Sequence, residues 1–240
     1  MDEHSPKRSD FIHHQQSKIS DSLREIVFGA EDGMVSTLGA LTGIAAGTQN
    51  QFAVIVAGFV IIFVESTAMS VGSFLSSKSV REMDERKLKE EEMEIEHYPQ
   101  GEQKELAKLY TSDGWPTQLA NQMAAAAAND KSLMLKEMAY RELGIIPNKA
   151  EQPFADAAFM FIFYMIGGSI PLLPYVLLPI SQALVVSIII TLVGLFGLGA
   201  ATTKFTKRNV IRAGAEVLIL GSVAAAIGYV VGQIANAIIL

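Results

Sequence analysis

The stretch from Phe52 to His97 constrains the fold more than any other part of the chain. It opens with the unbroken apolar run Phe52–Val64, and from Lys78 onward it is dense in charged residues. No proline interrupts it before Pro99, so the pattern predicts one helix of roughly 69 Å, more than twice the ~30 Å of bilayer hydrocarbon. Such a helix begins inside a membrane and ends in water.

Apolar residues gather in five segments, each long enough to span a bilayer. These segments are Ile26–Ala46, Phe52–Ser76, Phe154–Leu173, Ile180–Ala201 and Ala213–Ile239. The predicted fold is therefore an all-α membrane protein with five transmembrane helices and a cytosolic helical domain inserted between helices 2 and 3. The expected parts are an amphipathic cytosolic segment (1–25), transmembrane helices 1–2 (26–77), an acidic helical domain (78–151) and transmembrane helices 3–5 (152–240).

The positions of the basic residues predict the orientation of these helices. All 19 Lys and Arg residues fall before the first span, in the 78–149 region or between the fourth and fifth spans, and the loops 47–51 and 171–179 have none. The positive-inside rule then makes the N-terminus and the acidic domain cytosolic and the C-terminus external or luminal. The first 20 residues lack an apolar core, so no cleavable secretory signal is expected.

Composition also excludes several kinds of site and partner. The chain has no cysteine, which rules out disulfides and thiolate metal sites. Its net charge of −6 reflects acids that concentrate in the predicted cytosolic domain. Such a surface repels phosphates, so nucleic acid is not an expected partner.

Two acids lie inside predicted membrane spans. Asp32 is about 9 Å deep in the first span, and Glu65 lies one helical turn deeper than Met69 on the same face of the second. Ionised carboxylates are costly in hydrocarbon and usually mark an ion path. Two carboxylates with one thioether suit a borderline divalent transition metal better than Mg²⁺ or Ca²⁺. The alternative is that both acids are protonated and hydrogen-bonded for structural reasons, with Met69 as packing.

The acidic region is predicted to form four helices, which are broken at prolines, glycines and Asn129. Their expected ranges are Lys78–His97, Glu102–Thr111, Thr117–Ala128 and Lys131–Leu143. Two pairs with i, i+3 spacing, Glu91 with Glu94 and Glu102 with Glu105, flank the turn at Pro99. Antiparallel helices would bring these pairs together, where repulsion favours a bound cation; the alternative is a solvated charged face.

Glycines and prolines give further expectations about packing. Gly39, Gly43 and Gly47 repeat every four residues and so predict a close helix–helix contact, either within the chain or at a dimer seam. The sequence Pro171-Leu-Leu-Pro174 is expected to end the third span and Pro179 to open the fourth. Glu216 is expected to reach the membrane surface or to pair with Arg212, one turn earlier.

Several motifs together resemble the vacuolar iron transporter family over nearly the whole chain from about Leu23. They are Asp32-Gly-Met-Val-Ser-Thr-Leu-Gly39, Glu65-Ser-Thr-Ala-Met-Ser-Val-Gly-Ser-Phe-Leu-Ser76, Pro99-Gln-Gly-Glu-Gln-Lys-Glu-Leu106, Glu142-Leu-Gly144 and Pro171-Leu-Leu-Pro174. The resemblance implies a five-span homodimer, not an enzyme, that moves Fe²⁺ and often Mn²⁺ out of the cytosol in exchange for protons. The membrane would be a prokaryotic cell membrane or a vacuolar membrane.

The resemblance also implies roles for individual residues. The transport pathway would be Asp32, Glu65 and Met69, and the cytosolic domain would bind metal through Glu91, Glu94, Glu102, Glu105, Met138 and Glu142. No permanently bound cofactor is implied: Fe²⁺, or Mn²⁺, Co²⁺ or Zn²⁺, is the substrate.

The chain departs from the family pattern in three places. Ala68 precedes Met69 where the family usually has Ser, Gly72-Ser-Phe74 replaces Gly-Glu-Tyr, and Ala139 stands where a family glutamate is usual, with Glu137 nearby as a substitute.

Two other functions are compatible with parts of the sequence. A membrane-anchored ferritin-like protein that oxidises or stores iron would use the cytosolic acids, but it needs two Glu-x-x-His motifs and only Glu94–His97 matches. A scaffold that docks a basic partner would use the acidic domain and leave Asp32 and Glu65 unexplained.

Overall fold

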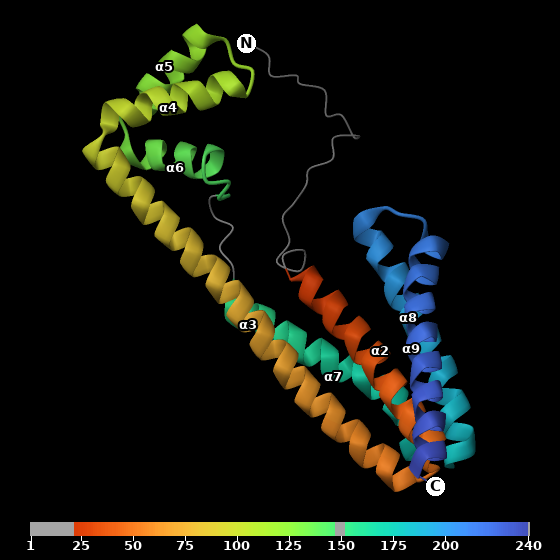
Figure 1. The fold of residues 1–240 in the computed structure, drawn as a ribbon. Helices are drawn as coiled ribbons and strands as arrows, with labels where there is room; N and C mark the ends of the chain where they lie inside the picture. The colour runs from red at the N-terminus through yellow and green to blue at the C-terminus, as the bar shows by residue number, and fades with distance from the viewer. Residues whose placement is uncertain (1–21, 147–151, 240) are drawn as a thin grey trace, which may run out of the picture. The chain divides into compact units, whose positions relative to one another are not determined.

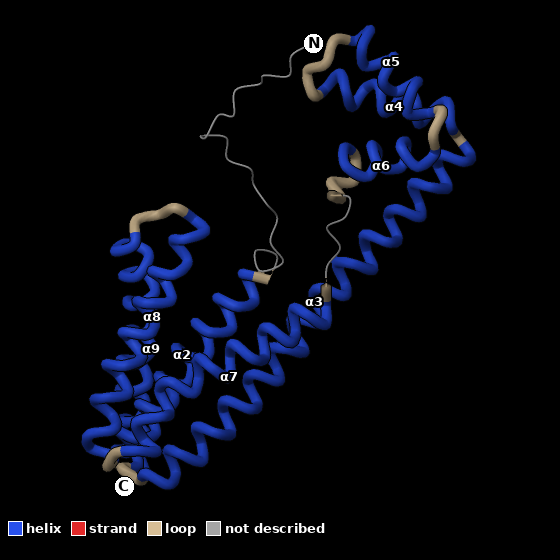
Figure 2. The backbone as a smooth tube through the Cα atoms, turned by 180° about the vertical axis from the view of Figure 1, so that it is seen from behind, coloured by secondary structure: helices blue, strands red, loops and turns tan. Residues whose placement is uncertain are grey.

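The computed structural model describes residues 22–146 and 152–239, and within these ranges it contains helices and no strand (Figures 1 and 2). The helices are α2 (Leu23–Thr48), α3 (Gln51–His97), α4 (Pro99–Ser112), α5 (Thr117–Ala128), α6 (Lys131–Arg141), α7 (Pro153–Leu177), α8 (Ile180–Thr206) and α9 (Val210–Ile239). The expected N-terminal amphipathic segment lies outside the described residues, apart from its last four positions.

The described chain divides into two compact units. The first takes the residues up to Ser70 and those from Ala158 onward, and the second is Val71–Ala157. The long helix α3 is continuous, as the sequence predicts, and it contributes its apolar start to the first unit and its charged end to the second.

In the first unit, α2 packs along α9 through backbone rather than side chains. A Cβ added to Gly43 would lie 2.8 Å from the carbonyl oxygen of Gly228, and one added to Gly47 would lie 2.9 Å from that of Gly232. Real Cβ atoms do not approach backbone so closely, so glycine is required at this contact. The four-residue glycine repeat of α2 therefore serves a contact within the chain.

A second glycine face of α2 packs on α7. A Cβ on Gly29 would lie 2.9 Å from the carbonyl oxygen of Met160, and one on Gly33 would lie 2.5 Å from that of Tyr164. The backbones of α2 and α7 thus touch along this face, in the manner of small-residue contacts between membrane helices. Helix α2 is therefore held closely from two directions.

Helix α7 does not end at Pro171-Leu-Leu-Pro174 as the sequence predicts, but continues through both prolines to Leu177. Proline lacks a backbone N–H, yet proline inside a helix is tolerated in membrane bundles, where neighbouring helices pack closely. Ser187 of α8 donates to the Pro171 carbonyl at 2.7 Å. The Gln51 amide donates to the carbonyls of Tyr175 at 2.8 Å and Leu178 at 3.1 Å, and so caps the end of α7.

In the second unit, α4, α5, α6 and the end of α3 surround one apolar core. The buried residues of this core are Ile95, Leu106, Ala107, Tyr110, Ala120, Ala124, Ala127, Met134 and Met138. Helix α5 has the predicted bounds, α4 starts earlier with Pro99 in its first turn, and α6 ends two residues earlier than expected. Asp130 caps α6 by accepting from the backbone of Ser132 at 2.9 Å and Leu133 at 3.2 Å.

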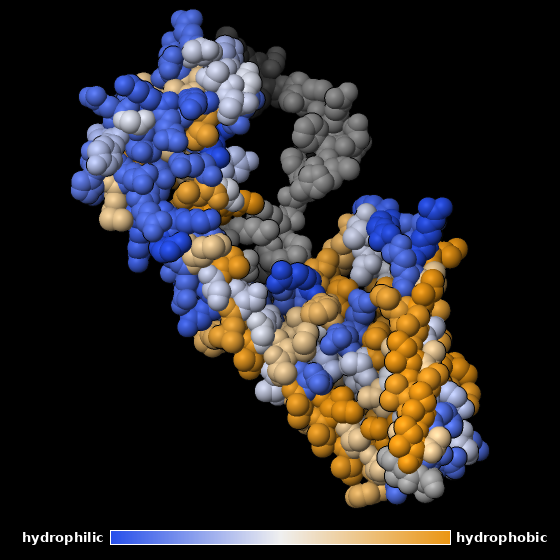
Figure 3. Space-filling model, viewed as in Figure 1, coloured by the Kyte–Doolittle hydropathy of each residue, from blue (hydrophilic) through white to orange (hydrophobic). Residues whose placement is uncertain are grey.

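Four of the described helices are long and apolar enough to cross a membrane: α3, α7, α8 and α9. Figure 3 shows hydrophobic side chains over α9, whereas the α4–α6 part of the chain is mostly hydrophilic. Helix α2 is long enough to span, but its acids lower its hydropathy, so the first of the five expected spans remains a prediction. Glu216 of α9 pairs with Arg208 at 2.7 Å, not with Arg212 as expected, because the α8–α9 turn brings Arg208 back over the start of α9.

Candidate metal sites

The two membrane acids of the sequence analysis come from neighbouring helices of the first unit and interact electrostatically. Asp32 of α2 is half-buried, and Glu65 of α3 is exposed on the single chain. Met69 lies one turn after Glu65, on the same face of α3, and is partly buried. The structure therefore brings the Asp32 and Glu65 carboxylates within electrostatic range and keeps a thioether one turn away.

Sequence reasoning missed a tyrosine beside these acids. Tyr164 of α7 is fully buried, and its hydroxyl lies 2.6 Å from Oγ of Ser36. Ser36, one turn after Asp32 on α2, donates to the Asp32 carbonyl at 2.6 Å. The Tyr164 hydroxyl also interacts electrostatically with the carboxylates of Asp32 and Glu65. A polar ring in the middle of an apolar span was the signal that could have singled it out.

A groove of about 1050 Å³ runs along α2 and α9. Its α2 wall extends from Val35 to Gln49, and its α9 wall extends from Ala224 to Asn236. Small and apolar residues form most of the lining, and Ser36 lies in the wall one turn beyond Asp32. The groove therefore extends from Ser36 to the C-terminal end of α2.

A second acidic site lies in the charged part of α3, beyond its apolar span, and in α4. Glu91, Glu94 and Glu102 each offer a carboxylate oxygen within 4.8 Å of the others. Glu91 is 3% exposed and Glu102 is 6% exposed, and each has a buried oxygen with no hydrogen-bond partner among the described residues. Buried carboxylates are rarely left unpaired, so this arrangement fits a divalent cation.

Electrostatics in this cluster oppose ionisation when no cation is bound. Burial, and after it the neighbouring charges of Glu142, Glu102 and Glu94, together raise the pKa of Glu91 to about 8. Burial is also the main cause that raises the pKa of Glu102, followed by Glu105, Glu94 and Glu142. The pKa of Glu142 is raised by burial and then by Glu105 and Glu94. Five of the six predicted cytosolic ligands therefore share one electrostatic environment.

The sixth predicted ligand, Met138, lies in the apolar core of the second unit and is fully buried. It is one turn before Glu142, at the end of α6. Packing thus holds its thioether near the end of α6, next to Glu142, which interacts electrostatically with the glutamate cluster.

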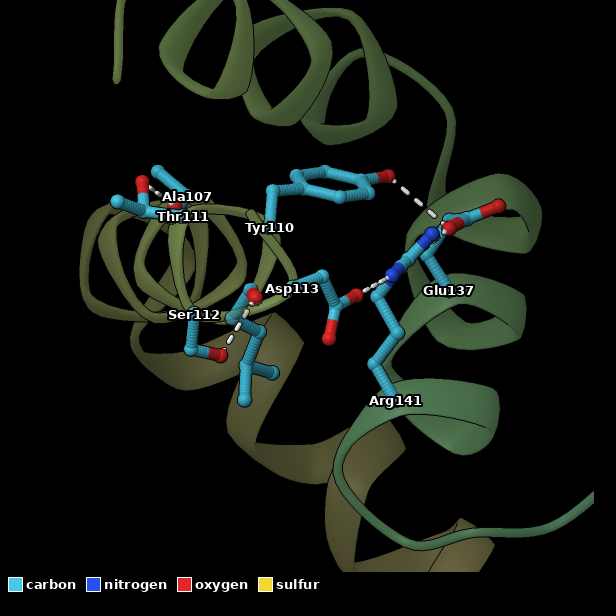
Figure 4. A network of polar contacts seen from close by, with 8 residues as sticks. Ala107, Tyr110, Thr111, Ser112, Asp113, Glu137 and Arg141 are labelled. Carbon is cyan, nitrogen blue, oxygen red and sulfur yellow. Dashed lines mark hydrogen bonds and ion pairs between the residues drawn. The ribbon is translucent and has the colours of Figure 1, made fainter. Parts of the chain in front are cut away.

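Glu137 belongs to a different network, which ties α6 to α4 (Figure 4). It accepts from the Tyr110 hydroxyl at 3.0 Å and from Nε of Arg141 at 3.1 Å. Arg141 also pairs with Asp113, and its guanidinium stacks 4.4 Å from the centre of the Tyr110 ring. Glu137 is therefore engaged away from the Glu91–Glu94–Glu102 cluster.

The single Glu-x-x-His motif gives no ligand pair in the structure. Nδ1 of His97 lies 2.7 Å from the carbonyl oxygen of Met93 within its own helix, and the side chain is exposed. The three-carboxylate cluster includes Glu94 without His97. This arrangement offers nothing specific to a ferritin-like centre.

The chain is similar to known proteins over most of its length. The chain is 27% identical to vacuolar iron transporter 1 of Arabidopsis thaliana over 233 residues, which is 95% of this chain and 93% of that protein. It is 24% identical to vacuolar iron transporter 2 of Oryza sativa subsp. japonica, over 95% of this chain and 90% of the relative. It is 25% identical to the vacuolar iron transporter of Plasmodium falciparum (isolate 3D7), over 89% and 82%.

The family comparison covers both candidate sites. The model of the VIT family matches residues 23–233, a range that contains the membrane acids, the glutamate cluster and nearly all of the described helices. This family is one of transporters rather than enzymes, as the sequence analysis expected. The chain belongs to the VIT family.

Proposed function

We propose that this chain, a metal transporter of the VIT family, moves Fe²⁺, and Mn²⁺ as well, out of the cytosol in exchange for protons. The names of its relatives, which are iron transporters, support the choice of metal. The observation that carries the proposal is that Asp32 of α2 and Glu65 of α3, two acids in a unit made of apolar helices, interact electrostatically. Carboxylates placed in this way mark ion paths.

The glutamate cluster is the proposed collecting site on the cytosolic side. Glu91, Glu94 and Glu102 form its centre, and Glu105 and Glu142 add negative charge around it. Oxygen ligands with this density of charge attract divalent cations, and the cation replaces the protons that the raised pKa values retain. Met138 is proposed to add a thioether, which favours Fe²⁺ over Mg²⁺.

Asp32, Glu65 and Met69 are the proposed transport site. Metal and protons compete for the same carboxylate oxygens, so protons that arrive from the far side of the membrane release the metal. The groove along α2 and α9 provides the proposed release route, because it leads from Ser36 to the C-terminal end of α2. That end is external or luminal in the proposed orientation.

A homodimer is proposed because a single chain leaves an acid uncovered. Glu65 is exposed on α3, and its neighbours Phe63 and Val64 are 53% and 58% exposed. A carboxylate in a lipid-facing position is costly, so a second copy that covers it is favoured. The assembled protein would have five spans per chain, because α2 would cross the membrane together with α3, α7, α8 and α9. The membrane would be a prokaryotic cell membrane or a vacuolar membrane.

The decisive experiment is metal flux into proteoliposomes that carry a pH gradient. Asp32→Asn is expected to abolish Fe²⁺ flux, because it removes the charge that binds the ion while preserving the shape of the side chain. Glu31→Gln is the matched control: it changes the adjacent acid of α2 and is expected to retain transport. Full flux through the Asp32 variant, or no proton movement coupled to metal in the unaltered protein, refutes the proposal.

A further inference from the structure

The membrane site contains a pair of hydroxyl groups that link α2 to α7. Ser36 and Tyr164 are 128 positions apart in the chain, yet their oxygen atoms lie 2.6 Å apart. Ser36 is half-buried and Tyr164 is fully buried. A hydroxyl pair this short, inside a unit made of apolar helices, is a specific contact that lipid-facing packing does not require.

The direction of the hydrogen bonds follows from their number. A hydroxyl group has one hydrogen, and that of Ser36 is directed to the Asp32 carbonyl at 2.6 Å. Tyr164 is therefore the donor to Ser36. The result is a directed chain that runs from the Tyr164 hydroxyl through Ser36 to the backbone of Asp32.

The surrounding backbone constrains the part of α7 that carries Tyr164. Gly33 allows α2 to touch α7 at the carbonyl of Tyr164, and a Cβ at Gly33 would approach that oxygen to 2.5 Å. The hydroxyl at the far end of the ring interacts electrostatically with the carboxylates of Asp32 and Glu65. Tyr164 thus joins the third helix of the site, α7, to the acids carried by α2 and α3.

We propose that Tyr164 and Ser36 are positioning residues of the transport site, which hold the Asp32 turn of α2 in the place where its carboxylate and that of Glu65 bind one cation together. The inference rests on the proposed transport function. In this proposal α7 contributes to metal binding indirectly, because Tyr164 helps to position Asp32. The Tyr164 hydroxyl does not need to contact the cation.

The test is the kinetics of Fe²⁺ uptake by proteoliposomes that contain the full chain. Tyr164→Phe keeps the ring and removes the hydroxyl, and it is expected to raise KM about fivefold, the value of one ordinary hydrogen bond, while Vmax changes by less than about twofold. Tyr175→Phe is the matched control. Tyr175 is also fully buried on α7, but it lies in an apolar cluster with Leu41 and Val54, away from the acids, so its KM is expected to stay unchanged.

Variants of Ser36 test whether the two hydroxyl groups act as one unit. Ser36→Ala is expected to raise KM as much as Tyr164→Phe, and the double variant no more than either single one. Ser36→Thr keeps the hydroxyl and is expected to raise KM less than Ser36→Ala does.

The outcomes separate this inference from the proposed function. An unchanged KM in Tyr164→Phe, an equal increase in Tyr175→Phe, or multiplied effects in the double variant overturns the positioning role. If the unaltered protein transports Fe²⁺ and Asp32→Asn does not, the transport function stands whatever Tyr164→Phe does. If the unaltered protein itself shows no uptake, the transport function fails first.

Discussion

Replacement of Glu91 by glutamine is expected to make the metal-free second unit more stable near neutral pH. Burial and neighbouring acids raise the pKa of Glu91 from 4.5 to about 8 in the folded protein. The folded state therefore holds a proton that the unfolded chain releases, and stability falls as pH rises from about 4.5 to about 8. Glutamine resembles the protonated carboxyl and carries no such dependence.

The size of the effect follows from the same pKa. With an unfolded value of 4.5 and a folded value of about 8, the contribution of Glu91 lowers the free energy of unfolding by about 3 kcal/mol at pH 7 and by about 1 kcal/mol at pH 5. As the pH rises from 5 to 7, the free energy of unfolding of Glu91→Gln should thus increase by about 2 kcal/mol relative to that of the unaltered protein. Glu102 and Glu142, whose pKa values are also raised, leave both proteins with a remaining slope in the same direction.

The chain offers a built-in probe for this measurement. Its single tryptophan, Trp115, lies between α4 and α5, so fluorescence of the full-length protein in detergent reports on the second unit. Urea unfolding in the presence of a chelator, at about pH 5 and about pH 7, gives the free energies needed. Glu92→Gln, an exposed change one position along α3, is the control and should follow the unaltered protein within about 0.5 kcal/mol.

Added metal should reverse the order of the two proteins. Fe²⁺ or Mn²⁺ stabilises the form that binds it, so the unaltered protein should gain more than Glu91→Gln from the same concentration. Parallel pH curves for the two proteins without metal would show that the pKa of Glu91 is not raised in the folded protein. Equal stabilisation of the two proteins by metal would show that Glu91 is not a ligand.

Three further changes test the packing and the sites. Gly228→Leu should separate α2 from α9 and abolish a monodisperse peak in size-exclusion chromatography, whereas Gly197→Ala, where nothing lies within 4 Å of the added carbon, should change thermal stability by at most about 1 kcal/mol. Arg141→Gln should lower the stability of the second unit by about 2 kcal/mol in the tryptophan assay, because its ion pairs and its contact with the Tyr110 ring are lost. Arg86→Gln is the control: it breaks an exposed ion pair and should cost less than about 0.5 kcal/mol. Met69→Leu keeps the volume and removes the thioether, so competition assays should show weaker preference for Fe²⁺ over Mg²⁺; an unchanged preference would mean that Met69 only packs.

Local sequence rules predicted the elements that depend on neighbouring residues. The absence of proline from Phe52 to His97 predicted one helix, and the turn at Pro99 predicted that Glu91 and Glu94 would meet Glu102. Both features depend on helical periodicity and on one proline, which a single sequence displays directly. The bounds of α5 were predictable for the same reason.

Contacts between distant segments were beyond sequence reasoning. The end of α7 depends on Gln51, a residue more than a hundred positions earlier, which supplies donors to its last carbonyls. The Ser36–Tyr164 bond depends on which helix packs against α2, and periodicity does not specify that partner. Glu137 is near Ala139 in the sequence and could be taken for a substitute ligand, but its carboxylate accepts hydrogen bonds from Arg141 and Tyr110.

The close backbone contacts of α2 limit how the proposed transport site could change access between the two sides of the membrane. Rotation of α2 about its own axis would drive side chains into the carbonyl groups of α7 on one side and of α9 on the other. If Asp32 is the transport site proposed above, alternating access to it from the two sides of the membrane requires the helices around α2 to move, because α2 itself cannot rotate.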